Sequence, residues 1–192
     1  MPAPKIAIIL GSTRPGRLGK GVADWVYGHA RKRTDAEFEF IDLADQGLPL
    51  LDEPVPPIAG RYTEDHTKAW AAKIAAFDGY IFVTAEYNHS VPAALKNAID
   101  FLYAEWNNKA CGFVSYGSAG GTRAVEHLRL IAAELQMADV RAQVFLPYSR
   151  QFEGREFRPT ENAAKALEPL FDQVIAWAGA LKPVRDAPST PE

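Results

Sequence analysis

The chain has 192 residues and a mass of 21.1 kDa, which is the size of one domain. Hydrophobic residues make up 47% and charged residues 23%, a balance that allows a buried core and excludes global disorder. The net charge of −3 and the isoelectric point of about 5.8 favour neither nucleic acid nor an anionic membrane as a partner. The apolar run at residues 6–10 is too short for a membrane span or a secretory signal, so we expect a cytoplasmic protein.

Cysteine and histidine usage excludes two further kinds of site. Cys111 is the single cysteine, so the chain has no intrachain disulfide and no CxxC metal motif. It falls inside a predicted buried strand, where we expect an inert thiol. The four histidines have neither HxxxH nor HExxH spacing, and we therefore expect no metal centre.

Short apolar runs alternate along the chain with segments whose apolar residues recur at helical spacing. The runs predict five strands, at residues 5–10, 38–43, 80–84, 110–115 and 140–146. The helical segments are centred on residues 22–29, 70–77, 95–102, 125–135 and 167–181. Pro169 interrupts the last helical face, so this helix is expected to begin near the proline or to bend there.

Strands that alternate with helices predict an α/β fold in which helices cover both faces of a parallel sheet. Right-handed crossovers leave few strand orders, and 2-1-3-4-5 is the common solution for five strands. We expect one domain over residues 1–182 and a disordered tail over residues 183–192. Ligands of such sheets bind beyond the carboxyl ends of the strands, near the switch point between strands 1 and 3. The loops after strands 1, 3 and 4 are therefore the candidate site.

The loop after the first strand, residues 11–21, reads GSTRPGRLGKG and opens a helix. Its unpaired amides, the helix dipole, two hydroxyls and several cations suit a phosphate group. The loop is not a Walker A motif, because Gly16 is followed by Arg17 and Leu18, and it lacks the GxGxxG spacing of a Rossmann fold. A solvated turn with incidental cations is the alternative interpretation.

The loop after the third strand places an aromatic ring and an amide in the expected crevice. Tyr87 is suited to stacking on a planar ring, and Asn88 to hydrogen bonding with polar atoms at the edge of such a ring. The alternative is a simple strand-to-helix turn in which Ser90 or Asn88 is the N-cap of the next helix.

The loop after the fourth strand, residues 115–123, contains three glycines that allow a ligand to approach the backbone closely. Arg123 falls in the first turn of the following helix, where a cation opposes the helix dipole. This position predicts an anion or a carboxylate as its partner. A flexible loop with a solvated arginine is the alternative.

Three stretches of these loops together carry a resemblance to a known family. GSTRPGRLGK, AEYNHSVPAALKNAIDFLY and SYGSAGGTRAVEHLR resemble the three motifs of the NADPH-dependent FMN reductase family. The resemblance spans residues 5–146, and its central motif, YNxSxPxxLKNAID, is highly specific. It implies a flavodoxin-like three-layer α/β/α sandwich and a relationship to quinone, azo-dye and chromate reductases. One departure is Ala85, where the family commonly has a proline.

The resemblance also implies a set of ligands and residues that bind them. One FMN is expected per subunit, with NADPH or NADH as the co-substrate. The residues implied for its phosphate are Ser12, Arg14, Leu18, Gly19 and Lys20, the last three through backbone amides. Those implied for the isoalloxazine ring are Glu86, Tyr87, Asn88, Ser115, Tyr116 and Gly117. Those implied for the nicotinamide nucleotide are Gly120, Gly121 and Arg123.

The implied reaction passes a hydride from the nicotinamide to the flavin, and then two electrons to a small acceptor. The acceptor classes are quinones, free flavins, azo compounds and metal oxyanions. Both substrates would use the same ring face in turn, which predicts ping-pong kinetics. Since the cofactor carries the chemistry, we assign no side chain as acid or base.

Two other functions on the same fold are considered. A flavodoxin-like electron carrier usually docks through a strongly acidic face, and the well-mixed charges of this chain offer little of that kind. A phosphate-binding hydrolase needs a nucleophile, which the chain lacks because Cys111 lies within a predicted strand. The sequence therefore favours the reductase.

Aromatic residues near the end of the third helix predict an oligomer. Phe101, Tyr103 and Trp106 lie outside the apolar stripe of that helix, and exposed aromatics of this kind are enriched at interfaces. The resemblance likewise implies homodimers or homotetramers built around the flavin sites. The alternative is that the C-terminal segment covers these aromatics within one chain. The acceptor pocket is expected to depend on residues 48–61 and 147–158.

Overall fold

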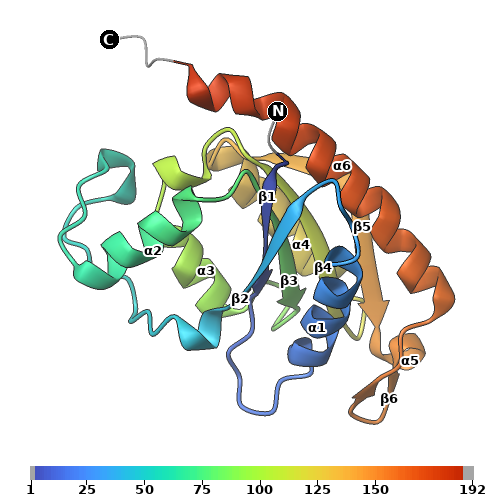
Figure 1. Cartoon of the computed structure of the whole chain (residues 1–192). Coiled ribbons are helices and arrows are strands. Elements are labelled where there is room, and N and C mark those ends of the chain that lie inside the picture. The colour runs from blue at the N-terminus through green and yellow to red at the C-terminus, as the bar shows by residue number, and fades with distance from the viewer. Residues whose placement is uncertain (1–2, 188–192) are drawn as a thin grey trace.

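The computed structural model describes residues 3–187, and its centre is a parallel sheet of five strands (Figure 1). The strand order is β2-β1-β3-β4-β5, which confirms the predicted order. The bounds are β1 Lys5–Leu10, β2 Glu37–Asp42, β3 Gly79–Ala85, β4 Ala110–Gly117 and β5 Ala138–Pro147. A two-stranded hairpin of β6 Phe152–Glu153 and β7 Glu156–Phe157 follows the sheet in the chain.

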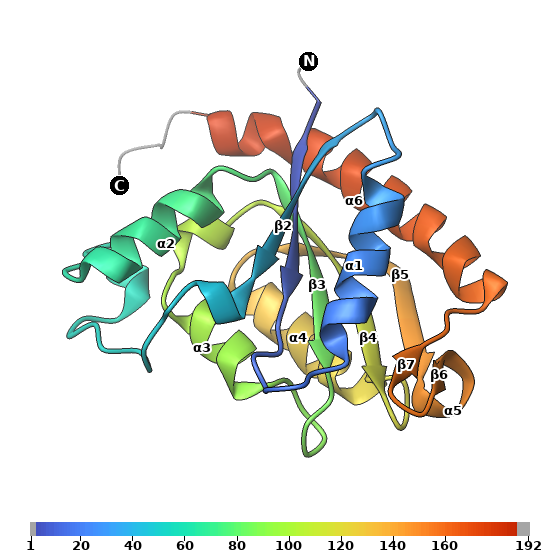
Figure 2. The ribbon, with the colours of Figure 1, turned by 60° about the horizontal axis from the view of Figure 1, so that its bottom comes forward.

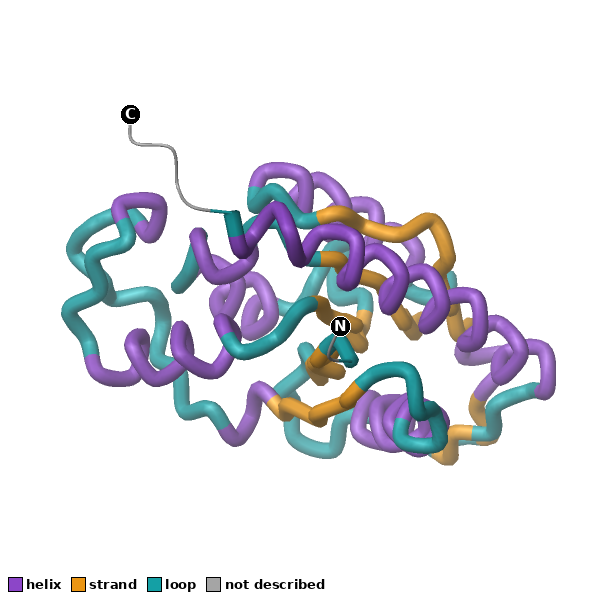
Figure 3. The backbone as a smooth tube through the Cα atoms, turned by 45° about the horizontal axis from the view of Figure 1, so that its top comes forward, coloured by secondary structure: helices purple, strands orange, loops and turns teal. Residues whose placement is uncertain are grey.

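Helices cover both faces of the sheet and complete the predicted flavodoxin-like three-layer sandwich. Figure 3 shows the strands in the middle with helices around them. One face packs on α1 (Gly19–Ala30) and α6 (Glu161–Asp186). The other face packs on α2 (Asp65–Ala75), α3 (Ala93–Asp100) and α4 (Thr122–Glu134). Short helical turns complete the chain: α5 Tyr148–Gln151 and three 3₁₀ turns at Leu43–Asp45, Pro57–Ala59 and Ala104–Trp106.

The central strands are apolar on both sides because each of their faces meets a helical layer. In β1, Ile6 and Ile8 belong to the core shared with α1 and α6, whereas Ala7 and Ile9 belong to the core on the opposite face. Each isoleucine buried in this way contributes about 1.5–3 kcal/mol to stability. Gly112 of β4 allows close packing of α6, since a Cβ at that position would lie 2.6 Å from Leu170 Cδ1.

The last helix differs from the expectation at both ends. It begins at Glu161 because the side chain of Thr160 caps it by accepting a hydrogen bond from the amide of Ala163. Pro169 lies within the helix rather than at its start, and the helix continues past Pro183 to Asp186. The predicted tail boundary at residue 183 is therefore wrong, and residues 188–192 of that prediction lie outside the described residues.

The predicted aromatic interface patch is also wrong. After α3 the chain enters the 3₁₀ helix Ala104–Trp106, which brings Trp106 back onto β3. The centre of its ring lies 4.8 Å from the centre of the Tyr80 ring. Trp106 and Phe101 are fully buried within this single chain, against the sheet and α2 rather than under the C-terminal segment. Tyr103 is half-buried, and its hydroxyl donates to the carbonyl of Glu134. These side chains are core and do not form a docking surface.

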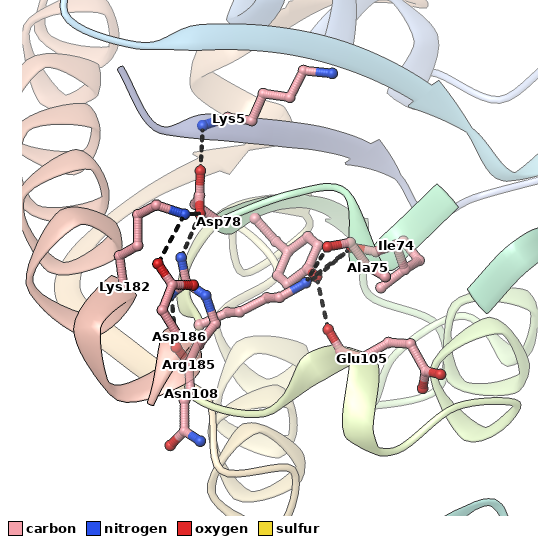
Figure 4. A network of polar contacts seen from close by, with 11 residues as sticks. Lys5, Ile74, Ala75, Asp78, Glu105, Asn108, Lys182, Arg185 and Asp186 are labelled. Carbon is pink, nitrogen blue, oxygen red and sulfur yellow. Dashed lines mark hydrogen bonds and ion pairs between the residues drawn. The ribbon is translucent and has the colours of Figure 1, made fainter. Parts of the chain in front are cut away.

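Polar side chains close the amino edge of the sheet, at the opposite end from the candidate loops (Figure 4). The carboxylate of Asp78 accepts from the amide of Lys5 at 2.9 Å and pairs with Arg185 and Lys182 of α6. These contacts fasten the end of the last helix to the start of the sheet.

The same edge holds a buried lysine. The ammonium of Lys109 donates at 3.0–3.2 Å to the carbonyls of Ile74 and Ala75, in the last turn of α2, and to the hydroxyl of Tyr80. Desolvation, and after it repulsion from Arg185, lowers the pKa of Lys109 to about 8.

No helix within residues 3–187 combines the length and apolar composition needed to cross a bilayer.

Candidate functional site

The loops after β1, β3 and β4 meet at the carboxyl edge of the sheet, as the strand order requires (Figure 2). The loop after β1 contacts the loop after β3, since Ser12 Oγ lies 2.7 Å from Tyr87 Oη. The loop after β3 contacts the end of β4, since the amide of Glu86 donates to the carbonyl of Tyr116 at 3.2 Å. All three predicted loops therefore form one site.

The loop after β1 contains a tight turn and then an uncapped helix. The amide of Arg17 donates to the carbonyl of Arg14 at 3.1 Å, with Pro15 and left-handed Gly16 (φ 65°) between them, as in a type II turn. Helix α1 then begins at Gly19 without a side-chain cap and without an acidic residue in its first turn. The first amides of α1 are thus left for a ligand, in line with the predicted amides of Leu18, Gly19 and Lys20.

A buried hydroxyl points at this helix start. Tyr116 is 2% exposed, and its Oη has no hydrogen-bond partner among residues 3–187. A Cβ at Gly19 would lie 2.1 Å from that oxygen, so any larger residue would displace it. Burial raises the pKa of Tyr116 well above its ordinary value, and the hydroxyl stays a donor at neutral pH. Ser12 is close enough to oppose part of this rise in the pKa of Tyr116, and its own hydroxyl lies 2.7 Å from Tyr87 Oη.

The cations of this loop differ in whether they are paired. Arg17 pairs with Asp42 at the end of β2, and Lys20 turns away to pair with Asp24 on the outer face of α1. Arg14 is exposed, and within the described part of the chain no carboxylate lies in ion-pair distance of it. It is therefore a free cation beside the positive end of α1, an arrangement that an anion would stabilise.

The loop after β3 is a two-residue hairpin rather than a helix cap. Tyr87 and Ser90 exchange backbone hydrogen bonds of 2.9 and 3.1 Å. Asn88 and His89 between them both have positive φ (48° and 75°), which costs energy in residues other than glycine. Because the N-cap of α3 is Pro92, the alternative in which Ser90 or Asn88 caps that helix is wrong.

The side chain of Tyr87 contacts the loop after β1, and its role in stacking on a planar ring stays a prediction. Its hydroxyl contacts Ser12, and the guanidinium of Arg14 lies 5.8 Å from the centre of its ring. Tyr87 thus links the phosphate-type loop to the hairpin. Ser90 Oγ lies 2.8 Å from Nδ1 of His127 on α4, which fastens the far side of the hairpin.

The comparisons with known proteins match this geometry. The family model described as NADPH-dependent FMN reductase matches residues 4–151. An NAD(P)H-dependent FMN reductase of Schizosaccharomyces pombe is 47% identical over 136 residues, covering 70% of this chain and 68% of that protein. The chain belongs to the NADPH-dependent FMN reductase family.

One further relative and one solved structure are similar to this chain. An NAD(P)H:quinone oxidoreductase of Solanum tuberosum is 33% identical over 141 residues, with 71% of each chain covered. The solved structure of FerB, a flavoenzyme NAD(P)H:(acceptor) oxidoreductase of Paracoccus denitrificans, superposes with a TM-score of 0.72 at 20% identity. It covers 93% of this chain and 98% of that one. The second likeness supports the fold.

In this FMN reductase family member, Arg123 has the carboxylate partner that its position predicts. Its guanidinium pairs with Glu86, and its amide donates to Glu86 Oε2 at 3.2 Å. Desolvation raises the pKa of Glu86, but bonds and charge from Arg123 outweigh it, so the net pKa is lowered and the pair is ionised at neutral pH. The side chain of Glu86 is buried by this contact.

The glycines of the loop after β4 also have internal partners. The carbonyl of Gly120 accepts from Ser115 Oγ at 2.8 Å, and a Cβ at Gly121 would lie 2.8 Å from the amide nitrogen of Tyr116. A Cβ at Gly117 would lie 3.3 Å from the amide nitrogen of Gly121. These contacts shape the loop itself, so a role of Gly120, Gly121 and Arg123 in nucleotide binding stays a prediction.

Sequence reasoning expected residues 147–158 to shape the acceptor pocket but named no single residue of that segment. Tyr148 lies beside Tyr116, with ring centres 6.5 Å apart, and Arg155 donates to the carbonyl of Gly16. Both come from a segment without a family motif. Phe152 and Phe157, which flank a turn at Gly154, were a signal for a short hairpin.

Cys111 is fully buried, as predicted, and burial raises the pKa of its thiol.

Proposed function

We propose that this chain is an FMN-dependent NAD(P)H oxidoreductase that reduces a small acceptor by a ping-pong mechanism. When bound, FMN supplies the redox chemistry, accepting a hydride from the nicotinamide and returning two electrons to the acceptor. The observation that carries the proposal is the unpartnered hydroxyl of Tyr116, buried against Gly19 at the uncapped start of α1. A phosphate fits this cradle, because it would accept from the hydroxyl and from the helix amides together.

The protein's part in binding the phosphate is to supply donors and positive charge. The amides of Leu18, Gly19 and Lys20 and the hydroxyl of Tyr116 donate, and Arg14 is the cation without a carboxylate of its own. The N-terminus of a helix adds roughly half a positive charge. The hydroxyl of Ser12, which contacts Tyr87, is the further side-chain donor assigned to the phosphate.

The protein's part at the flavin ring is to present backbone groups held in fixed positions. The hairpin at Tyr87–Ser90 is fixed by its two backbone bonds and by the ion pair between Glu86 and Arg123. That pair also neutralises the carboxylate of Glu86 directly before the hairpin, which would otherwise oppose the negative charge that reduction brings to the ring. We infer that backbone groups of Glu86, Tyr87, Asn88, Ser115, Tyr116 and Gly117 line the isoalloxazine ring.

Neither rival function gains support from the site. A hydrolase of the cysteine type needs a reactive thiolate, and the thiol of Cys111 is fully buried in β4 with a raised pKa. An electron carrier differs from a reductase in that it does not turn over with a nicotinamide nucleotide and a small acceptor. NADPH or NADH as co-substrate, a quinone as acceptor, and an oligomer of at least two chains are further parts of the proposal, and they rest on the family resemblance.

The experiment is to mix the purified protein with FMN, remove the unbound flavin and record the absorption spectrum and the steady-state oxidation of NADPH with a quinone. A flavin spectrum at one FMN per chain together with turnover supports the reductase. A flavin spectrum without turnover would identify a carrier. A protein that acquires no flavin spectrum would overturn the proposal.

A further inference from the structure

We propose that the hairpin formed by β6 and β7 is a latch on the phosphate-binding turn, and that Arg155 is the positioning residue of this latch. The hairpin lies beyond residue 151, where the match to the family model ends. The identity of the ligand at the turn rests on the function proposed above. The contact between hairpin and turn does not, because it exists in the protein alone.

A chain of aromatic contacts seats the hairpin on the site. Tyr148 lies next to Tyr116, Phe152 lies 5.2 Å from Tyr148, and Phe157 lies 5.1 Å from Phe152, between ring centres. Phe157 also meets the ring of Trp25 on α1 edge-on at 5.4 Å. Phe152 and Phe157 face each other at the base of the hairpin. This base therefore contacts Tyr148, the neighbour of the residue that bears the unpartnered hydroxyl, and also the helix whose start forms the cradle.

Arg155, at the tip of the hairpin, reaches the tip of the turn at Arg14–Arg17. Its guanidinium donates to the carbonyl of Gly16, and a Cβ on Gly16 would lie 3.2 Å from the same nitrogen. Gly16 is the left-handed residue of the turn, and its carbonyl belongs to the peptide group that joins it to Arg17, so this bond holds the chain where it leaves the turn.

Charge supports a specific role for this arginine. Among residues 3–187, no carboxylate lies within ion-pair distance of Arg155, although Glu153 and Glu156 stand on the same hairpin. Those two glutamates pair with Arg158 instead, which is 60% exposed. Arg155 therefore contacts the turn, whereas Arg158 forms its ion pairs within the hairpin. The two arginines form a matched pair for an experiment.

The latch has one counterpart on the other flank of the turn, the ion pair of Arg17 with Asp42. With both contacts in place, the turn is held from both sides and Arg14 is presented next to Tyr87. With Arg155 removed, one support remains. The turn is then expected to open more often and to release a bound phosphate group faster.

The test compares Arg155→Ala with Arg158→Ala by hydrogen exchange of the FMN-free protein. The amide of Arg17, which donates to the carbonyl of Arg14 across the turn, is expected to exchange about 5-fold to 10-fold faster in Arg155→Ala, the scale of one lost hydrogen bond, and at the wild-type rate in Arg158→Ala. Arg155→Lys, which keeps a donor able to reach Gly16, is expected to restore most of the protection. Equal exchange in Arg155→Ala and wild type would overturn the latch.

FMN binding supplies the second readout. Arg155→Ala is expected to raise the FMN dissociation rate about 5-fold to 10-fold while leaving riboflavin binding unchanged, since riboflavin lacks the phosphate. Its melting temperature without FMN should fall by no more than about 4 °C, the shift expected for one lost hydrogen bond of about 1 kcal/mol; a larger fall would assign Arg155 to general stability and refute the positioning role. If wild type binds no FMN, the function proposed above fails, and the exchange experiment still decides the latch.

Discussion

The unpartnered hydroxyl of Tyr116 leads us to predict that one substitution stabilises the FMN-free protein and at the same time weakens the binding of FMN. A buried hydroxyl without a partner costs about 1–3 kcal/mol, and Tyr116 Oη is such a group at 2% residue exposure. Tyr116→Phe removes the oxygen and little else. The FMN-free variant should therefore be more stable by about 1 kcal/mol, or about 2–4 °C in melting temperature.

The same change should weaken FMN binding. A hydrogen bond from this hydroxyl to a charged phosphate is worth about 1.5–3 kcal/mol, which corresponds to a loss of affinity of about 10-fold to 100-fold. Riboflavin should bind Tyr116→Phe as it binds wild type. Urea unfolding of the FMN-free protein and fluorescence titration with both flavins measure the two effects separately.

Tyr80→Phe is the matched control. Tyr80 is equally buried, but its hydroxyl donates to the carbonyl of Ile74 at 3.0 Å and accepts from Lys109. Removing a satisfied hydroxyl leaves those partners unpaired, so Tyr80→Phe should destabilise the protein by about 1–3 kcal/mol. If Tyr116→Phe destabilises the FMN-free protein as Tyr80→Phe does, the hydroxyl has a partner and the reasoning about the cradle is refuted.

Four more substitutions test other parts of the account. Arg14→Ala should weaken FMN binding by about 1.5–3 kcal/mol and leave riboflavin binding nearly unchanged, as measured by titration. Equal losses of affinity for the two flavins would show that Arg14 supports the fold instead of binding the phosphate. Gly19→Ala should destabilise the folded protein by about 1–3 kcal/mol, because the added Cβ clashes with Tyr116. Gly28 is in the same helix with open space around it, so Gly28→Ala should stabilise the protein by about 0.5–1 kcal/mol. Urea unfolding measures both changes. Because the folded-state pKa of Lys109 is lowered to about 8, the unfolded chain binds more protons than the folded chain between pH 8 and 10.5. As the pH rises through that window, the free energy of unfolding of wild type should therefore increase by up to about 3 kcal/mol relative to that of Lys109→Met. A difference between the two proteins that does not change with pH would contradict the lowered pKa.

The order of the sheet and the position of the site could be predicted because local signals and fold rules agree there. The apolar run before Gly11 predicts a strand buried on both faces, and the strand order then brings the loops after β1, β3 and β4 together. The position of Arg123 in the first turn of a helix predicted a carboxylate partner, which is Glu86. Each of these inferences needs only the local sequence and the topology.

The errors arose where a distant contact decides the structure. Trp106 lies outside the stripe of α3, and its burial depends on a 3₁₀ turn that folds it back onto Tyr80. The start of α6 is set by the cap at Thr160, which outweighs the signal from Pro169. Arg155 meets Gly16 across 139 residues of chain, a contact that no local pattern predicts.

The most direct test of the central claim is a titration of the purified FMN-free protein with FMN and, separately, with riboflavin. The account predicts one FMN per chain, bound at least about 100-fold more tightly than riboflavin, because the cradle at Gly19 and Tyr116 acts on the phosphate alone. Equal affinities for the two flavins, or no binding of FMN, would contradict it.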